Sequence, residues 1–317
     1  MIEIHSVPYD LGGARQGSRL GPDALRLAGL VPTLTDVLGK GTVSVGKRIT
    51  TNLDVERSET GLPFVDPLMS VLQPLKTATL ASLEAGRLPL MLGGEHSLSV
   101  GPISACLEKF GSELAVFWID AHADINTPGV SPSLNVHGMP LALLSGAGSG
   151  SSDEAIDSDW TRLQTVVGTT KLPLSHVSWL GLRDVDEGEQ EPVGHGFPIS
   201  MHRIDRHGIV DAWERIVQRI RDCGCKYLYV SFDVDVMDPI LAPGTGTSVR
   251  GGLTYREAHL LAELMHDTLA SPNAPFKLIG LDLVEVSPIH DTNNQTATVT
   301  VEWVASLFGK RILRGAF

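Results

Sequence analysis

The sequence predicts an α/β fold in which a mostly parallel central sheet lies between two layers of helices. Apolar runs of strand length alternate with segments of helical periodicity, and this alternation is typical of parallel sheets covered on both faces. No repeat and no convincing boundary divides the chain, so we expect residues 1–317 to form a single domain. A hydrophobic content of 42% in 317 residues is enough for one substantial core.

Five apolar runs are expected as buried strands: 88–92, 114–119, 177–182, 227–232 and 276–281. Between the expected strands 177–182 and 227–232, residues 207–223 carry apolar side chains at spacings of three and four. This periodicity predicts a helix that packs one apolar stripe on the sheet. "CGC" at 223–225 is interpreted as the end of this helix and not as a metal site, because no second cysteine pair exists. Residues 145–159, rich in Gly, Ser and Asp, predict a mobile surface loop.

Charge and composition narrow the class of function. The formal net charge of −12 argues against a surface that binds nucleic acid and favours an acidic exterior or a cationic ligand. No basic leader and no apolar run of bilayer length is found, so we expect a cytoplasmic protein without a membrane partner. Three cysteines are too few for a disulfide framework and are expected to be reduced.

The stretch "DAHADINTP" directly follows the expected strand at 114–119. Asp120, His122 and Asp124 stand at alternate positions, and an extended chain sends alternate side chains to the same side. Two carboxylates and an imidazole so close together would perturb one another strongly unless a cation lay between them, and this ligand mixture suits Mn²⁺ or Zn²⁺. A solvated strand end is the ordinary alternative for one such stretch taken alone.

Other expected strands also end in ionisable residues. His96 follows 88–92, Asp233 and Asp235 follow 227–232, and Glu285 follows 276–281. Ligands of open α/β sheets bind beyond the carboxyl ends of the strands, so these groups should face one crevice. Two imidazoles and four carboxylates are too many ligands for one tetrahedral zinc ion, but they suit two bridged divalent ions. The candidate metal ligands are His96, Asp120, His122, Asp124, Asp233 and Asp235. A two-metal centre activates water near neutral pH, which predicts hydrolysis.

Eight motifs in this order resemble the ureohydrolases and, within them, the arginases. They cover nearly the whole chain: "PYDLGGARQGSRLGPDAL", "GGEHS", "DAHADINTP", "NVHGMP", "GLRDVDEGE", "SFDVDVMDP", "GTGTSVRGGLTYRE" and "GLDLVEVSP". The resemblance implies the arginase-like fold and two Mn²⁺ ions per subunit. In that arrangement Asp120 and Asp233 bridge both ions, His96 and Asp124 complete one coordination sphere, and His122 and Asp235 complete the other.

The resemblance also implies a substrate pocket. Relatives with the same metals hydrolyse arginine, agmatine, other guanidino acids or formiminoglutamate, and the loop after "DAHAD" separates them. In arginases the α-carboxylate is held at positions that match Asn126, Ser131, Ser133 and Asn135. The α-ammonium is held at positions that match Asp186 and Glu189, while Asp184 is a supporting candidate and Thr247 a weaker pocket candidate. Ser131, Pro132, Leu134 and Glu187 depart from the usual family pattern.

These observations lead to a specific functional expectation. The chain is expected to hydrolyse L-arginine to L-ornithine and urea, with Asp124 accepting and passing on a proton, Glu285 orienting the guanidinium and His137 relaying protons to solvent. A homo-oligomer, trimer or hexamer, is implied by the resemblance. The alternative is hydrolysis of another guanidino compound, such as agmatine or a guanidino acid. A nucleotide-binding protein is disfavoured, since the chain has no Walker loop and no GxGxxG after a strand; a catalytically silent relative is the remaining alternative.

Overall fold

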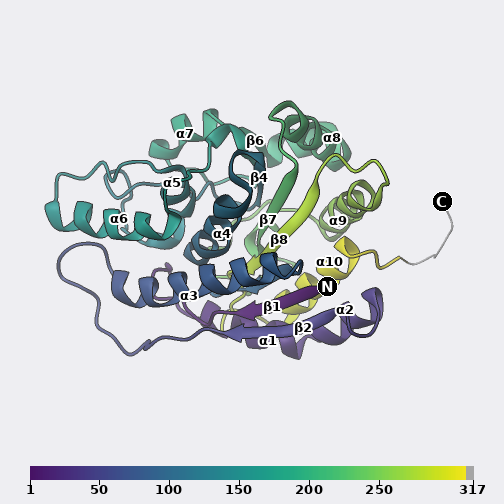
Figure 1. Ribbon diagram of the computed structural model, residues 1–317, viewed down its shortest axis with the longest axis horizontal. Coiled ribbons are helices and arrows are strands. Elements are labelled where there is room, and N and C mark those ends of the chain that lie inside the picture. The colour runs from purple at the N-terminus through teal and green to yellow at the C-terminus, as the bar shows by residue number, and fades with distance from the viewer. Residues whose placement is uncertain (312–317) are drawn as a thin grey trace.

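The computed structural model describes residues 1–311 and contains one sheet of eight parallel strands, as the alternating pattern predicts (Figure 1). The strand order is β2-β1-β3-β8-β7-β4-β5-β6. The strands are β1 (Ile2–Ser6), β2 (Val43–Arg48), β3 (Leu88–Leu92), β4 (Leu114–Ile119), β5 (Val177–Leu182), β6 (Phe197–Ser200), β7 (Tyr227–Asp233) and β8 (Lys277–Val284). The predicted single domain extends to residue 317, and its last six residues lie outside the described part.

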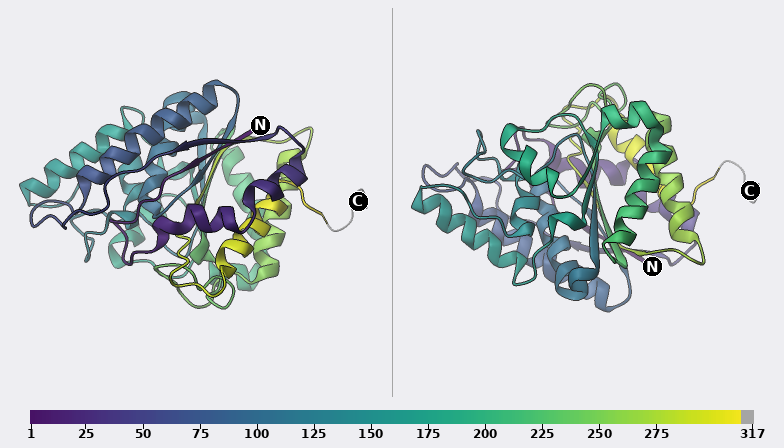
Figure 2. Two further views of the ribbon diagram at one scale, coloured as in Figure 1. Left: turned by 90° about the horizontal axis from the view of Figure 1, so that it is seen from below. Right: turned by 90° about the horizontal axis from the view of Figure 1, so that it is seen from above.

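Helices cover both faces of the sheet, which gives the expected three layers (Figure 2). One face packs against α3 (Val65–Glu84), α4 (Val100–Phe110), α5 (Pro140–Ser145) and α6 (Glu154–Val167). The other packs against α1 (Gly21–Leu27), α2 (Leu30–Leu38), α8 (Met201–Asp222), α9 (Tyr255–Ala270) and α10 (Gln295–Leu307). Alternate residues of a strand serve the two cores: Phe117 belongs to one and Trp118 to the other. The short helix α7 (Gln190–Gly194) precedes β6.

Two predicted boundaries differ from the structure, and one predicted helix is confirmed. Strand 276–281 is too short, because β8 continues through Asp282 to Val284 and buries that carboxylate inside the strand. The predicted loop 145–159 is wrong at its end, since α6 begins at Glu154 after the Asp153 side chain accepts hydrogen bonds from Ala155 N and Ile156 N. The helix 207–223 is confirmed as the main part of α8, which starts earlier across a non-helical Gly208 and ends at Asp222, just before "CGC".

The topology places the functional motifs next to one another. β3, β8, β7 and β4 are the four consecutive strands at the centre of the sheet, and β5 is the next neighbour of β4. Since all pairings are parallel, the carboxyl ends of these strands meet at one edge. No helix within residues 1–311 has both the length and the apolar character needed to cross a membrane.

Candidate active site

A cavity of about 140 Å³ opens at the carboxyl edge of the central strands. Most of the residues expected from the sequence line it. The exceptions are His96, Asp120, Asp235 and Glu285, which are buried beside residues that line the cavity. The structure therefore brings all the expected site residues to one place in the fold.

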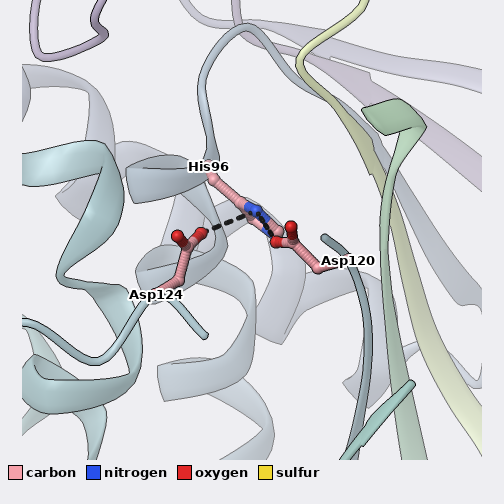
Figure 3. Close-up of side chains that lie close together, drawn as sticks. All are labelled: His96, Asp120 and Asp124. Atoms are coloured by element: carbon pink, nitrogen blue, oxygen red, sulfur yellow. Dashed lines mark ion pairs between the residues drawn. The ribbon is translucent and has the colours of Figure 1, made fainter. Parts of the chain in front are cut away.

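The first cluster of possible metal ligands surrounds the imidazole of His96 (Figure 3). His96 begins the turn η2 (His96–Ser99) after β3, and its Nδ1 lies 3.0 Å from Asp120 Oδ2, 2.9 Å from Asp124 Oδ2 and 3.2 Å from Asp233 Oδ2. Gly94 in "GGEHS" lets the N-terminal loop cross here, since any side chain at this position would collide with the Tyr9 backbone. These contacts join β3, β4 and β7 at a single point.

The second cluster surrounds His122 and shares Asp120 with the first. His122 Nδ1 lies 3.4 Å from Asp120 Oδ1 and 3.0 Å from Asp235 Oδ2. The two oxygens of Asp120 thus serve different clusters, which fits the expectation that Asp120 bridges. Asp233 Oδ2 lies 3.2 Å from His96 Nδ1, while its Oδ1 accepts a hydrogen bond of 2.8 Å from Asp235 N. Bridging by Asp233 stays a prediction.

The electrostatics of both clusters favour a bound cation. Burial raises the pKa of Asp124 to about 6, helped by the nearby Asp120 carboxylate, and burial with Asp235 and Asp120 raises the pKa of Asp233 well above its ordinary value. Burial opposes protonation of His96, but its three carboxylate neighbours raise its pKa well above the ordinary value. The pKa of Asp120, in contrast, is lowered by its two histidine neighbours, so the carboxylates of the two clusters differ in how readily they take up a proton.

The donor set and its geometry fit a divalent metal. Nδ1 of His96 is fully buried and makes no hydrogen bond of acceptable direction, although three carboxylate oxygens lie within 3.2 Å. A cation among these oxygens would satisfy them and the nitrogen at once, and carboxylate oxygen with imidazole nitrogen is a set that Mn²⁺ and other divalent ions accept. The two His/Asp clusters could therefore hold metal.

Neighbouring side chains that the sequence did not single out fix these ligands. Trp118 stacks on the His96 ring at 4.0 Å and donates a hydrogen bond of 3.0 Å from Nε1 to Asp120 Oδ2. Ser231 lies 2.8 Å from His96 Nε2, through its Oγ. Arg183 binds the backbone carbonyl of Asp235 and, at 2.8 Å, that of Val249, tying two loops of the site together. Trp118 and Ser231 each precede a ligand by two positions, so strand alternation could have revealed them.

His137 and Glu285 form a pair beside the His96 cluster. His137 Nδ1 lies 3.2 Å from Glu285 Oε1, which also accepts a hydrogen bond of 3.0 Å from His96 N. Burial lowers the pKa of His137, but Glu285, together with Glu95 and Asp124, outweighs this effect and raises the pKa to about 9. Glu285 and Asp124 have φ angles of 62° and 51°, a left-handed conformation that is unusual for side chains other than glycine and asparagine and often marks functional sites.

The expected carboxylate-binding loop forms one wall of the cavity. The Ser131 and Ser133 hydroxyls accept hydrogen bonds from Leu134 N at 3.1 Å and Asn135 N at 3.2 Å, and Leu134 has a φ of 58°. Asn126 donates from Nδ2 to Asp186 Oδ2 at 2.9 Å. The Asn135 side-chain amide makes no hydrogen bond within residues 1–311 and stands at the cavity wall, free to meet a ligand.

The acidic side of the cavity comes from the segment after β5. Glu189 accepts backbone hydrogen bonds from Ile125 and Asp186, both at 3.0 Å, and burial raises its pKa to about 7. Asp184 is 64% exposed at the cavity mouth, with Oδ2 3.9 Å from His122 Nε2. Thr247 Oγ1 donates to Asp235 Oδ2 at 3.0 Å. Within the described chain, Glu189 and Thr247 thus support neighbouring site residues as well as lining the cavity.

Comparison with known proteins identifies the family. A family model described as the arginase family matches residues 1–309. The chain is 37% identical over 321 residues to an arginase of Staphylococcus aureus, with 98% of each chain covered. Among solved structures, the arginase of Bacillus caldovelox aligns with a TM-score of 0.86 at 33% identity, covering 98% of this chain and 99% of that one. An Entamoeba histolytica arginase in complex with L-ornithine aligns with a TM-score of 0.83 at 27% identity, covering 98% of each.

The match spans nearly the whole chain and includes the segments that build both His/Asp clusters and the cavity above them. On this evidence the chain belongs to the arginase family.

Proposed function

We propose that this protein hydrolyses L-arginine to L-ornithine and urea, using two Mn²⁺ ions per subunit. The observation that carries the proposal is the pair of His/Asp clusters that share Asp120 beneath a small polar cavity. Its ligand residues would be His96, Asp120, Asp124 and Asp233 for one ion, and Asp120, His122, Asp233 and Asp235 for the other. When bound, the metal pair activates water as a nucleophile by Lewis-acid chemistry.

The chain's own residues handle the proton and the guanidinium. The Asp124 carboxylate, which lines the cavity, takes a proton from the attacking water and delivers it to the departing amine. Glu285 holds the guanidinium end of the substrate in position. His137, paired with Glu285 at 3.2 Å and lining the cavity, exchanges protons with solvent.

The far end of the cavity recognises the amino acid. Asn126, Ser131, Ser133 and Asn135 offer neutral amides and hydroxyls for the α-carboxylate, while Asp184, Asp186 and Glu189 offer acids for the α-ammonium, with Thr247 holding Asp235 nearby. Agmatine lacks the carboxylate that the first group would bind. Hydrolysis of another guanidino compound is the second candidate, because the metal clusters act on the guanidinium that all these substrates share.

The assembly and location complete the proposal. We infer a cytoplasmic homo-oligomer, trimer or hexamer, by resemblance to the family, without nucleic-acid or membrane partners. The net charge of −12 supports the first exclusion, since a phosphate backbone would be repelled. Light scattering coupled to size exclusion measures the assembly; a monomer under conditions of full activity would contradict it.

One assay tests the reaction. After loading with Mn²⁺, urea release is measured from L-arginine, agmatine and 4-guanidinobutyrate at equal concentrations. We expect arginine to have clearly the highest kcat/KM, with metal analysis approaching two ions per chain. A preference for agmatine or guanidinobutyrate would select the second candidate function, and turnover by metal-free protein would refute the metal-dependent reaction.

A further inference from the structure

Asp282 is a buried acid that the proposed reaction does not use. It lies inside β8, between Leu281 and Leu283, and is fully buried among the central strands. An ionised carboxylate in such a place is costly unless hydrogen-bond donors surround it. Burial raises the pKa of Asp282, and the donors around it act against that rise.

Two hydroxyl groups of β7 supply the closest of those donors, and Ser99, whose hydroxyl lies 3.4 Å from that of Ser231, supplies a further one. Ser231 Oγ donates to Asp282 Oδ1 at 2.6 Å, and Tyr229 Oη donates to Asp282 Oδ2 at 2.8 Å. Residues 229 and 231 point to the same side of β7, and the register that pairs Ser231 with Asp282 brings the hydroxyls to the carboxylate. Each oxygen of Asp282 therefore has its own donor.

The hydrogen bonds along this chain of contacts determine which ring nitrogen of His96 carries a proton. A serine hydroxyl carries one proton, and Ser231 donates it to Asp282, so Ser231 Oγ accepts a hydrogen bond from His96 Nε2, which lies 2.8 Å away. In the neutral imidazole, the form that binds a metal ion, Nε2 then carries the one ring proton and Nδ1 is bare. Nδ1 is the atom that faces the oxygens of Asp120, Asp124 and Asp233. A bare nitrogen in that position is a metal ligand.

We propose that Asp282 is a positioning residue that acts through Ser231 to hold His96 with Nδ1 bare and directed into the first metal cluster. Asp282 touches neither substrate nor metal in this arrangement. Its role rests on the proposed metal-dependent function and deepens it, because it determines how tightly the ion beside His96 is held. Groups that orient a metal-bound histidine in this way change metal affinity by about 10- to 100-fold when they are replaced.

The chain of hydrogen bonds from Asp282 through Ser231 to His96, together with Tyr229, offers matched variants. Asp282→Asn keeps the shape but removes the charge, and Ser231→Ala cuts the link between Asp282 and His96. Tyr229→Phe removes a hydrogen bond from the same carboxylate at a similarly buried position and leaves the Ser231 link in place. If the role is orientation of His96, the first two variants weaken the metal site and the third does not.

Mn²⁺ affinity is measured by competition with a chelator, together with the Tm of each variant with and without Mn²⁺. We expect Asp282→Asn and Ser231→Ala each to lower the affinity of one site by about 10- to 100-fold, the double variant to be no weaker than either, and Tyr229→Phe to stay within about 3-fold of wild type. The rise in Tm that Mn²⁺ produces should shrink in the first two variants only.

Wild-type affinity in folded Asp282→Asn would overturn the proposal, as would an equal loss in Tyr229→Phe. If Asp282→Asn does not fold, unchanged affinity in Ser231→Ala overturns it instead. A wild type that binds no Mn²⁺ would overturn the proposed function as well. A wild type that binds two ions and hydrolyses arginine, beside an Asp282→Asn variant of equal affinity, would refute only the role of Asp282.

Discussion

Asn135 is the residue at which the proposed preference for arginine is most exposed to test. The Ser131 and Ser133 hydroxyls already accept backbone hydrogen bonds, and Asn126 is bonded to Asp186. The Asn135 amide has no such partner in residues 1–311 and lines the cavity. It can therefore donate to the α-carboxylate without first breaking an existing bond, whereas the Asn126 amide already donates to Asp186; the Ser131 and Ser133 hydroxyls keep their own protons for the same ligand.

The expected size of its contribution follows from the type of bond. A hydrogen bond to a charged group contributes about 1.5–3 kcal/mol, and the half-buried position of Asn135 favours the lower end of that range. Asn135→Ala should therefore raise KM for arginine about 10-fold, with kcat changed by less than about 3-fold. KM for agmatine should stay within about 2-fold, because agmatine has no carboxylate to lose the contact.

Asn135→Asp is the matched variant, since it keeps the shape and adds a negative charge. Two like charges about 4 Å apart repel by about 1 kcal/mol even in water, so arginine should bind at least about 5-fold more weakly than in Asn135→Ala, and agmatine should not. Steady-state kinetics on both substrates, with metal content measured in parallel, provide the test. An equal loss for the two substrates, or no loss for arginine, would refute the assignment of this loop to the carboxylate.

Further predictions concern the metal, the proton path and acid stability. Chelation should abolish urea release and lower the Tm, and Mn²⁺ at about 1,000 times its Kd should restore about 4 kcal/mol per site, or about 6 °C for a chain of 317 residues, as scanning calorimetry can measure. An unchanged Tm would contradict a structural link between metal and fold. His137→Asn should lower kcat by about 10²-fold with normal metal content; unchanged kcat would remove His137 from the proton path. Burial lowers the pKa of His5 below its ordinary value of 6.5 in the folded state. Just below pH 6.5 the unfolded chain therefore binds more protons than the folded chain, and the free energy of unfolding should fall as the pH drops through 6.5. The free energy of unfolding, measured with urea at pH 7.5 and 5.5, should differ less between the two pH values in His5→Gln than in the wild type. An equal difference in the two proteins would refute this.

The five strands from β3 to β5 in the sheet order were predictable, whereas β1 and the two edge strands were not. Runs such as 114–119 are apolar throughout because both faces of a central parallel strand are buried. β2 is an edge strand with exposed and half-buried residues, including Val45, Gly46 and Lys47, so it carries no continuous apolar signal. β6, at the other edge, is only four residues long. These strands form because β1 and β5 offer backbone partners, which local sequence does not reveal.

Within the site, residues were predictable when their chemistry interrupted an apolar pattern. Asp120, His122 and Asp124 stand out after β4, and His96 stands out after β3. Ser231 and Trp118 belong to apolar-looking strands, and their roles depend on contacts made across the sheet. The sequence predicts that the last strand ends at Leu281, before Asp282, because a charge in a strand interior requires donors that only the neighbouring strand supplies.

The arrangement of acids links the stability of this edge of the sheet to its chemistry. Asp120, Asp124 and Asp233 all approach one imidazole, and burial beside the other carboxylates raises the pKa of Asp124 and Asp233. Asp124 is in addition held in a left-handed backbone conformation, which costs free energy that the surrounding packing must offset. A bound cation would offset the repulsion between the carboxylates and would stabilise the same strained backbone conformation. The residues that would bind the metal therefore destabilise the empty edge and stabilise the filled one, so that the energy of metal binding holds Asp124 in the position from which it can move a proton.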